Sequence, residues 1–348
     1  MMAEEGMGRT DMAMVSRITR DLKDAVMLVD TSGSIVYFNP RVEELLGRKD
    51  IHTGMKYALL MDGDKGNDEL HQFVLDSVYD KDRVHKGELR YKLPEGGELF
   101  LQISSSYAFS EDQREKIGVI LQFSDITEEH RLRIRYFDAT KILIAMLAIF
   151  VLYNFAYCIW IAAGKNLLTA ENMTTVFMTF GVIGTLFGLR FTSLTVADFG
   201  LGTKGLKKSL LSNALLTAVM IMIMLTVKLL LRKNGVMDPE APFFRWDLWS
   251  LGETIYPLTV FSQELITRGA MQGALRMVLP ENTPDVVAII ISSLYFGALH
   301  LHKGLVFMIG ATLLLSVFGF IYSRQGTIWG LCIPHYFLGL SLTVIWGA

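Results

Sequence analysis

A series of apolar segments fills the second part of the chain and constrains its fold more than any other feature. A helix needs about 20 apolar residues to cross the hydrocarbon core of a bilayer, and most of these segments reach that length. The fifth is short, so it is either re-entrant or deeply buried among the others. The segments are 142–162, 175–196, 210–231, 251–279, 286–301, 304–322 and 328–346. They predict an all-α polytopic helix bundle of about seven membrane spans.

Charge divides the chain near the point where these segments begin. The part up to Thr140 holds 19 basic and 26 acidic residues, whereas the part from Lys141 holds 14 and 9. The first part has the composition of an acidic soluble domain and the second that of a membrane domain. Neither carries the basic stripe of a nucleic-acid-binding protein, so no nucleic-acid partner is expected. The apolar segments make the lipid bilayer the expected partner. We expect these parts: a flexible tail over 1–15, a soluble domain over 16–128, a helical linker over 129–141 and a membrane domain over 142–348.

The soluble domain has the pattern of a small α+β fold. Residues 25–30 and 35–39 are predicted to form two strands joined by a turn. A helix follows, with Asn39 expected to cap it, Pro40 in its first turn and Gly47 at its end. Three further strands are expected over 88–93, 98–106 and 117–123.

This order of strands and helices resembles that of a PAS domain. The resemblance rests on Asp30, Gly33 and Asn39–Pro40 near the start and on Ser124–Thr127 at the end. It implies a sensor that dimerises or holds a small apolar or aromatic ligand of unknown identity. The domain has no cysteine to react with a flavin. The histidines in this domain and directly after it are interpreted as ordinary surface or core residues rather than haem ligands: His52, His71, His85 and His130.

A charged helical pattern runs from Thr127 to Asp138 and enters the first apolar segment without a proline or glycine. One interpretation is a signal helix that transmits motion from the PAS domain to the membrane. The other is a simple anchor whose basic residues contact anionic headgroups. Apolar positions within the pattern also predict a homodimer formed through the PAS domain and this helix.

The basic residues of this helix and of 204–208 predict that the PAS domain lies in the cytoplasm, following the positive-inside rule. Basic residues in the loop 232–245 favour the opposite orientation. The chain is accordingly expected to be a multi-pass protein of the cell membrane with its PAS domain inside the cell.

Among the polar or ionisable residues of the later apolar segments, five are candidate site residues, because such groups are costly there and by default mark a functional site. Gln263, Glu264 and Arg268 share the fourth segment. Because Arg268 comes four residues after Glu264, the two side chains lie on one helix face and can pair. His300 and His335 lie in two other segments. One carboxylate and two imidazoles on three helices predict a site.

These residues also carry a resemblance to the CPBP family of intramembrane endopeptidases, which includes the CAAX-prenyl proteases and bacteriocin-processing proteins. The pattern departs from the family at Gln263, where glutamate is usual, and at Gly339, where Asn or Asp is usual. The motifs that match in order and spacing are Gln263–Gly269, Phe296 with His300, and Gly326–Gly330 followed by His335.

The resemblance implies a PAS-regulated endopeptidase that hydrolyses peptide bonds of a membrane-associated substrate, either prenylated or carrying a leader peptide. It assigns the activation of water to Glu264 and His300, and the stabilisation of the oxyanion to His335. Arg268 would orient the carboxylate, and Gln263 would hold the water. No cofactor is expected at the membrane site.

Alternatives to this interpretation stay open. Glu264, His300 and His335 match the two-histidine, one-carboxylate ligand set of catalytic zinc, with His302 as a spare ligand. No His-Glu-x-x-His helix is present to support it. The two departures from the family pattern also fit a catalytically weakened homologue that acts as a membrane sensor, receptor or scaffold. A transporter is less favoured, because the ionisable residues cluster at one site instead of lining a path.

Overall fold

The computed structural model describes residues 17–61, 66–80, 85–109, 116–163 and 170–347. The flexible tail expected over 1–15 lies outside the described residues. The chain divides into two compact units, Met1–Arg133 and Ile134–Ala348. The division falls inside one helix, α5 (Thr127–Ala162), which is uninterrupted as its sequence pattern predicted.

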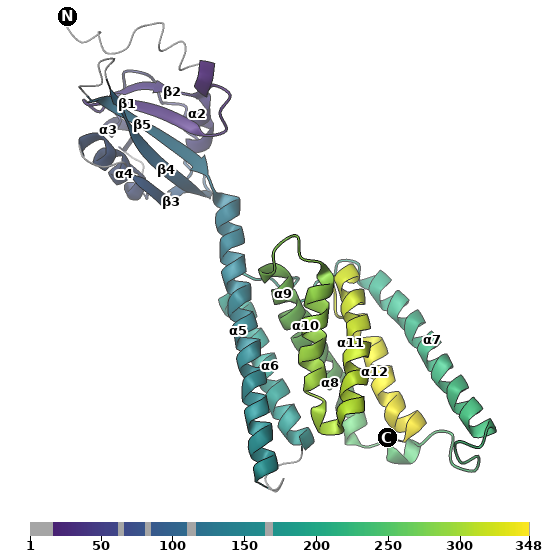
Figure 1. Ribbon diagram of the computed structural model, residues 1–348. Coiled ribbons are helices and arrows are strands. Elements are labelled where there is room, and N and C mark those ends of the chain that lie inside the picture. The colour runs from purple at the N-terminus through teal and green to yellow at the C-terminus, as the bar shows by residue number, and fades with distance from the viewer. Residues whose placement is uncertain (1–16, 62–65, 81–84, 110–115, 164–169, 348) are drawn as a thin grey trace, which may run out of the picture. The chain divides into compact units, whose positions relative to one another are not determined.

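The first unit is built on a five-stranded antiparallel sheet (Figure 1). Its strands lie in the spatial order β2-β1-β5-β4-β3. Strands β1 and β5, the first and last in the sequence, therefore pair with each other. The strand positions predicted from the alternating apolar pattern are confirmed to within a few residues. The observed strands are β1 (Ala25–Asp30), β2 (Ile35–Phe38), β3 (Lys86–Lys92), β4 (Glu98–Phe109) and β5 (Lys116–Asp125).

Helices α2 (Pro40–Leu46), α3 (Ala58–Met61) and α4 (Asp68–Tyr79) complete the first unit. Burying one large apolar side chain contributes about 2 kcal/mol, so a shared apolar core supplies most of the driving force for folding. Helices and strands contribute to a single such core, for example through Val42, Val74, Met27, Leu101 and Leu121.

Asn39 does not cap α2 with its side chain, contrary to expectation. It stands directly before Pro40, but its side chain forms no capping hydrogen bond. The side chain is instead fully buried, and its Oδ1 accepts a hydrogen bond from the N–H of Val26 at 3.0 Å. Its Nδ2 donates to the carbonyls of Thr19 and Asp24 at 2.9 and 3.0 Å. Asn39 thus joins the start of β1 to the segment that precedes it.

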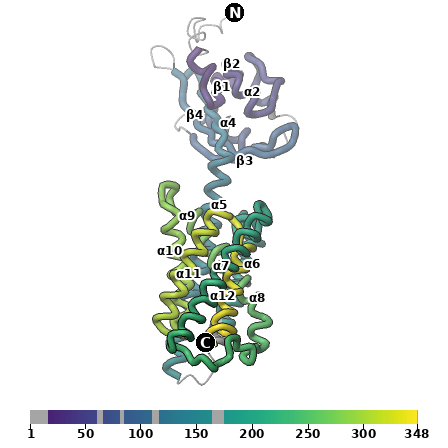
Figure 2. Tube along the Cα trace, turned by 90° about the vertical axis from the view of Figure 1, so that its right-hand side faces the viewer, coloured from purple at the N-terminus to yellow at the C-terminus, as the bar shows by residue number. Residues whose placement is uncertain are grey.

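The second unit is helical. Figure 2 shows α12 running beside α7 and α8, and α12 contacts both helices. Helices α10 and α11 also pack along each other. Besides α5, its elements are α6 (Ala170–Phe191), α7 (Leu206–Lys233), η1 (Trp246–Leu248), α8 (Leu251–Glu264), η2 (Leu265–Gln272), α9 (Gly273–Val278), α10 (Asp285–Ala298), η3 (Leu301–Lys303), α11 (Leu305–Gln325), α12 (Cys332–Ser341) and η4 (Leu342–Trp346).

Three of the described helices, α5, α7 and α11, are long and apolar enough to cross a membrane by length and composition. Shorter apolar helices cover 175–191, 285–298 and 332–346. The expected count of seven spans is therefore not confirmed. One physical reason is that a predicted apolar segment can contain a break in its helix. In the segment 286–301, α10 ends at Ala298 and a short 3-10 turn begins at Leu301.

Large apolar side chains on α7 face outward. Leu211, Leu215 and Met222 are 63%, 69% and 63% exposed. A contiguous apolar face of this kind is rare on a soluble protein and marks a surface that meets a membrane or a partner. The length of α7 and this exposed face together indicate a helix that contacts lipid.

Candidate active site

Glu264 and His335 meet between two helices. Glu264 is the last residue of α8 and fully buried, and His335 lies on α12. Nδ1 of His335 donates a hydrogen bond to Oε1 of Glu264 at 2.6 Å. In a neutral imidazole this bond selects the tautomer with the lone pair on Nε2. Because Nε2 bonds to none of the described residues, it is the atom of this pair that is available to a reactant.

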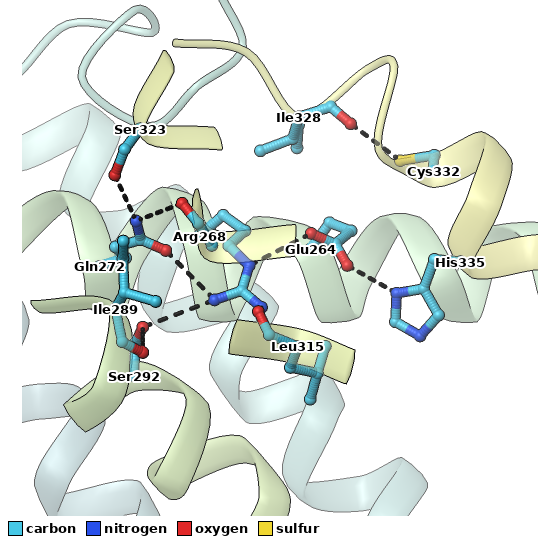
Figure 3. A network of polar contacts seen from close by, with 11 residues as sticks. Glu264, Arg268, Gln272, Ile289, Ser292, Leu315, Ser323, Ile328, Cys332 and His335 are labelled. Atoms are coloured by element: carbon cyan, nitrogen blue, oxygen red, sulfur yellow. Dashed lines mark hydrogen bonds and ion pairs between the residues drawn. The ribbon is translucent and has the colours of Figure 1, made fainter. Parts of the chain in front are cut away.

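Arg268 lies on the other side of Glu264 from His335 (Figure 3). It is fully buried, and its Nε lies 3.6 Å from Oε2 of Glu264. Its Nη1 donates to Oε1 of Gln272 at 3.1 Å and to Oγ of Ser292 at 3.5 Å, and its Nη2 donates to the carbonyl of Leu315. These contacts fix the guanidinium where its charge offsets that of the carboxylate.

Gln272 completes this network, although it was not among the predicted site residues. Its Nε2 donates to the carbonyl of Gly319 at 3.0 Å and to Oγ of Ser323 at 3.1 Å. Glycine at 319 leaves the necessary room, because a Cβ there would lie 3.1 Å from Nη1 of Arg268 and from Oε1 of Gln272. The sequence held a signal for Gln272, since it follows Arg268 by four residues inside an apolar segment.

The backbone changes its geometry at this site. Helix α8 ends at Glu264, and the next eight residues, η2, form a π-helix before α9 resumes the α-helical geometry. All residues of η2 are buried. Since π-helical turns are rare and occur often at functional sites, their position beside the buried ion pair supports a functional interpretation of this region.

His300 does not join the hydrogen bond between Glu264 and His335. It follows the end of α10, where its Nδ1 donates to the carbonyl of Phe296 at 3.1 Å and its ring lies 5.6 Å from that of Phe307. Among the described residues it forms no hydrogen bond or ion pair with Glu264 or His335. The structure pairs Glu264 with His335 and not with His300.

Among the described residues, the side chain of Gln263 bonds to α6 and not to the other predicted site residues. Its Nε2 contacts Sδ of Met178 on α6 at 3.7 Å. It has no hydrogen bond to the other predicted site residues in the part of the chain that the structure describes. Of the five predicted site residues, the structure brings three into one contacting group: Glu264, Arg268 and His335.

The described residues do not assemble the ligand set that was considered for zinc. Over those residues, no group of three or more His, Cys, Asp or Glu side chains is placed to hold a metal ion. His300 is the member of the set that does not join the other two. A zinc mechanism therefore has no geometric support in the described residues.

Gly339, one of the two departures from the family pattern, lies against Tyr256 of α8. A Cβ at position 339 would lie 2.0 Å from the hydroxyl oxygen of Tyr256, much closer than real Cβ atoms approach other atoms. The ring of Tyr256 also packs 6.0 Å from that of Tyr336. Sequence reasoning missed Tyr256, since nothing in the pattern of α8 indicates that it meets α12 at a glycine.

Family comparisons match both units of the chain. Residues 245–340 match the family model described as type II CAAX prenyl endopeptidase Rce1-like. Residues 23–128 match a PAS domain model. The chain thus combines an N-terminal PAS domain with a region that matches the Rce1-like CAAX protease family model, and that region contains Glu264, Arg268, His300 and His335.

Solved structures similar to the chain include several PAS domains. That of a protein from Colwellia psychrerythraea is 21% identical, with a TM-score of 0.27, over 33% of this chain and 97% of that one. The PAS domain of the fruit-fly ELK potassium channel is 18% identical, with a TM-score of 0.28, over 33% and 96%. That of BvgS from Bordetella pertussis is 15% identical, with a TM-score of 0.25, over 33% and 84%. No curated protein matches the chain.

Proposed function

We propose that this chain is a PAS-regulated intramembrane endopeptidase that hydrolyses a peptide bond of a membrane-associated substrate. The buried contact between Glu264 and His335 carries the proposal, because it lies in the region that matches a CAAX prenyl endopeptidase family. The family description favours a prenylated peptide over a leader peptide as substrate. The exposed apolar helices support a place in the cell membrane, and the basic residues at 204–208 support a cytoplasmic PAS domain.

The hydrogen bond between His335 and Glu264 defines the form of the imidazole that the proposed mechanism uses. In this form the Nδ1–H of His335 bonds to Glu264 and Nε2 carries the free lone pair. This differs from the roles implied by the family resemblance, which assign the base to Glu264 with His300.

The free nitrogen of His335 can act as a general base. It accepts a proton from water while the water oxygen attacks the carbonyl carbon of the substrate, and it then returns the proton to the leaving amine. Glu264 holds the imidazole in the productive tautomer and stabilises the imidazolium that forms in between. Arg268 lies beside the carboxylate and holds it in place.

Contacts between α5 and the loop that joins α6 to α7 support regulation by the PAS domain. Oδ2 of Asp138 on α5 accepts a hydrogen bond from the N–H of Ser193 in this loop at 2.7 Å. Farther along the same loop, the carbonyl of Gly200 accepts a hydrogen bond at 3.0 Å from the N–H of Ile328, shortly before α12. A displacement of α5 would therefore reach the segment that leads to His335.

Cleavage of an internally quenched peptide that ends in a prenylated Cys-a-a-X sequence tests this proposal, with the full chain in detergent micelles. Glu264→Gln and His335→Gln are each expected to lower kcat/KM by about 100-fold or more, because each removes part of the general-base pair. His300→Gln is the matched control, since it removes an imidazole that does not contact Glu264. We expect it to lower kcat/KM by less than about tenfold.

The same assay separates the alternatives. A large loss in His300→Gln with little change in His335→Gln would return the base to His300. Activity that a chelator abolishes would assign the reaction to zinc. Binding of the peptide without Glu264-dependent cleavage would contradict the endopeptidase proposal and favour a receptor or scaffold, a candidate that the orientation of Gln263 toward Met178 supports.

A further inference from the structure

The geometry points to Tyr256 as a catalytic residue: its hydroxyl donates a hydrogen bond to the oxyanion that forms when water attacks the substrate carbonyl. This inference rests on the proposed endopeptidase function and adds a residue to it. Helix α12 has an unusual feature. The residue one turn after His335 is a glycine, Gly339, and the phenol of Tyr256 packs directly against it.

The position of the hydroxyl is defined by Gly339. Since a Cβ at this residue would lie 2.0 Å from the hydroxyl oxygen of Tyr256, the phenol occupies the space that a side chain at 339 would take. An amide borne on that side chain would carry its N–H within a few ångströms of the same place. Tyr256 therefore supplies a donor from α8 where α12 has none.

The hydroxyl lies at the same helix interface as the reacting pair. His335 and Gly339 are four residues apart, so they lie on one face of α12. That face meets α8 twice: His335 contacts Glu264, and Gly339 contacts Tyr256. Both contacts belong to one interface between α8 and α12 and are one turn apart along α12, so the hydroxyl and Nε2 of His335 can address one substrate carbonyl group.

The hydroxyl of Tyr256 is available for this role. It forms no hydrogen bond with any residue that the structure describes, and its ring is only partly buried. A phenol is a neutral donor, so it adds no further charge beside Arg268 and Glu264. Donors placed before the reaction are effective because they need no reorganisation when the charge develops.

The attack of water on the substrate carbonyl uses His335 and Tyr256 together. The water oxygen forms a bond to the carbonyl carbon, the π electron pair of the carbonyl moves to its oxygen, and the water proton goes to Nε2 of His335. Tyr256 donates a hydrogen bond to the resulting oxyanion and keeps its own proton. Collapse of this intermediate expels the amine, which takes the proton back from His335.

Tyr256→Phe is the decisive variant, because it removes the hydroxyl and keeps the ring that packs against Gly339 and Tyr336. With the prenylated quenched peptide, we expect kcat to fall about 100-fold while KM changes little, since the lost bond forms only in the transition state. Tyr336→Phe removes a neighbouring phenol and serves as the matched control, with kcat expected within about twofold of wild type.

A substitution pair tests the geometry independently of the single variant. Gly339→Asn alone should lower activity and the melting temperature, because its Cβ collides with the phenol. In Tyr256→Ala/Gly339→Asn the collision is gone and an amide donor stands near the vacated place, so the double variant should be more active than either single one.

Three outcomes are distinguishable. A selective fall in kcat for Tyr256→Phe, in a protein whose cleavage depends on Glu264, supports the role of Tyr256. An unchanged kcat in Tyr256→Phe overturns that role and leaves the endopeptidase proposal intact. A wild-type protein without Glu264-dependent cleavage overturns the endopeptidase proposal, and the role of Tyr256 with it.

Discussion

The two units of this chain bury polar side chains in different ways. In the first unit, Asn39 is neutral and its partners are backbone groups of Val26, Thr19 and Asp24. In the second unit, buried Arg268 is charged and lies beside a buried carboxylate. A neutral amide that satisfies backbone groups stabilises one fold. A buried ion pair contributes little net stability, so its presence in the second unit is better explained by function.

The largest expected effect comes from breaking the buried ion pair. Arg268→Met leaves Glu264 buried without its counter-charge, and this should destabilise the second unit by about 3–5 kcal/mol. The double variant Glu264→Gln/Arg268→Met removes both charges and should recover much of that stability, because the pair itself contributes little net stability. Chemical unfolding of the full chain in detergent micelles measures both differences.

Arg276→Met is the matched control for this prediction. Arg276 on α9 pairs with Asp285 at 3.2 Å, but the two side chains are 38% and 50% exposed. Exposed pairs of this kind contribute about 0–1 kcal/mol, so the control should stay close to wild type. Equal destabilisation by Arg268→Met and Arg276→Met would contradict the contrast drawn between the two units.

A smaller loss is expected in the first unit from Asn39→Ala. The substitution leaves one backbone N–H and two carbonyls without their partner at a fully buried position. Each buried group that loses its hydrogen-bond partner costs about 1–3 kcal/mol. Because nearby water can satisfy some of these groups, we expect the free energy of unfolding to fall by about 2–3 kcal/mol in total. Thermal unfolding of the full chain, followed in the sheet signal of the first unit, measures it.

Asn39→Ser distinguishes this explanation from helix capping. Serine is among the preferred capping residues, so it would preserve stability if Asn39 acted as a cap. Its shorter side chain cannot bond to Val26, Thr19 and Asp24 together. We therefore expect Asn39→Ser to be nearly as unstable as Asn39→Ala, and wild-type stability in the serine variant would restore the capping role.

The fold of the first unit could be predicted closely from the sequence, and that of the second less so. The strands of the PAS domain show a local alternation of apolar and polar residues, with turns between them, and both signals are short in range. The helices of the second unit were located as apolar segments, but their ends were not. The π-helix η2 has no sequence signature, so its start at Leu265, directly after Glu264, could not be predicted.

From the sequence, only those contacts of the site that depend on spacing within one helix could be predicted. Glu264 and Arg268 are four residues apart on one segment, so their pairing was expected and is observed. The choice between His300 and His335 as partner of Glu264 depends on tertiary packing, as does the approach of Tyr256 to Gly339. No spacing within one helix carries that information.

The smallest expected effect concerns an exposed ion pair of the first unit, between Arg48 and Asp50. Nη2 of Arg48 lies 2.8 Å from Oδ2 of Asp50, whose side chain is 56% exposed. Hydrogen bonds from the Arg48 guanidinium hold the pKa of Asp50 below its ordinary value of 3.8. The ionised form is thus favoured in the folded state, and the stability that it contributes is present above pH 3.8 and lost as the pH falls through the lowered pKa.

Asp50→Asn removes this contribution at every pH. Because the pair is exposed and screened by solvent, we expect the variant to lose less than about 1 kcal/mol at pH 6, well below the loss in Asn39→Ala. The difference in melting temperature between wild type and Asp50→Asn should shrink as the pH falls below 3.8, because the stability contributed by the ionised carboxyl group is lost there. A difference that stays constant from pH 6 to pH 3 would show that the pair does not act through charge. A loss as large as that of Asn39→Ala would mean that an exposed charge stabilises the first unit as strongly as its buried amide does.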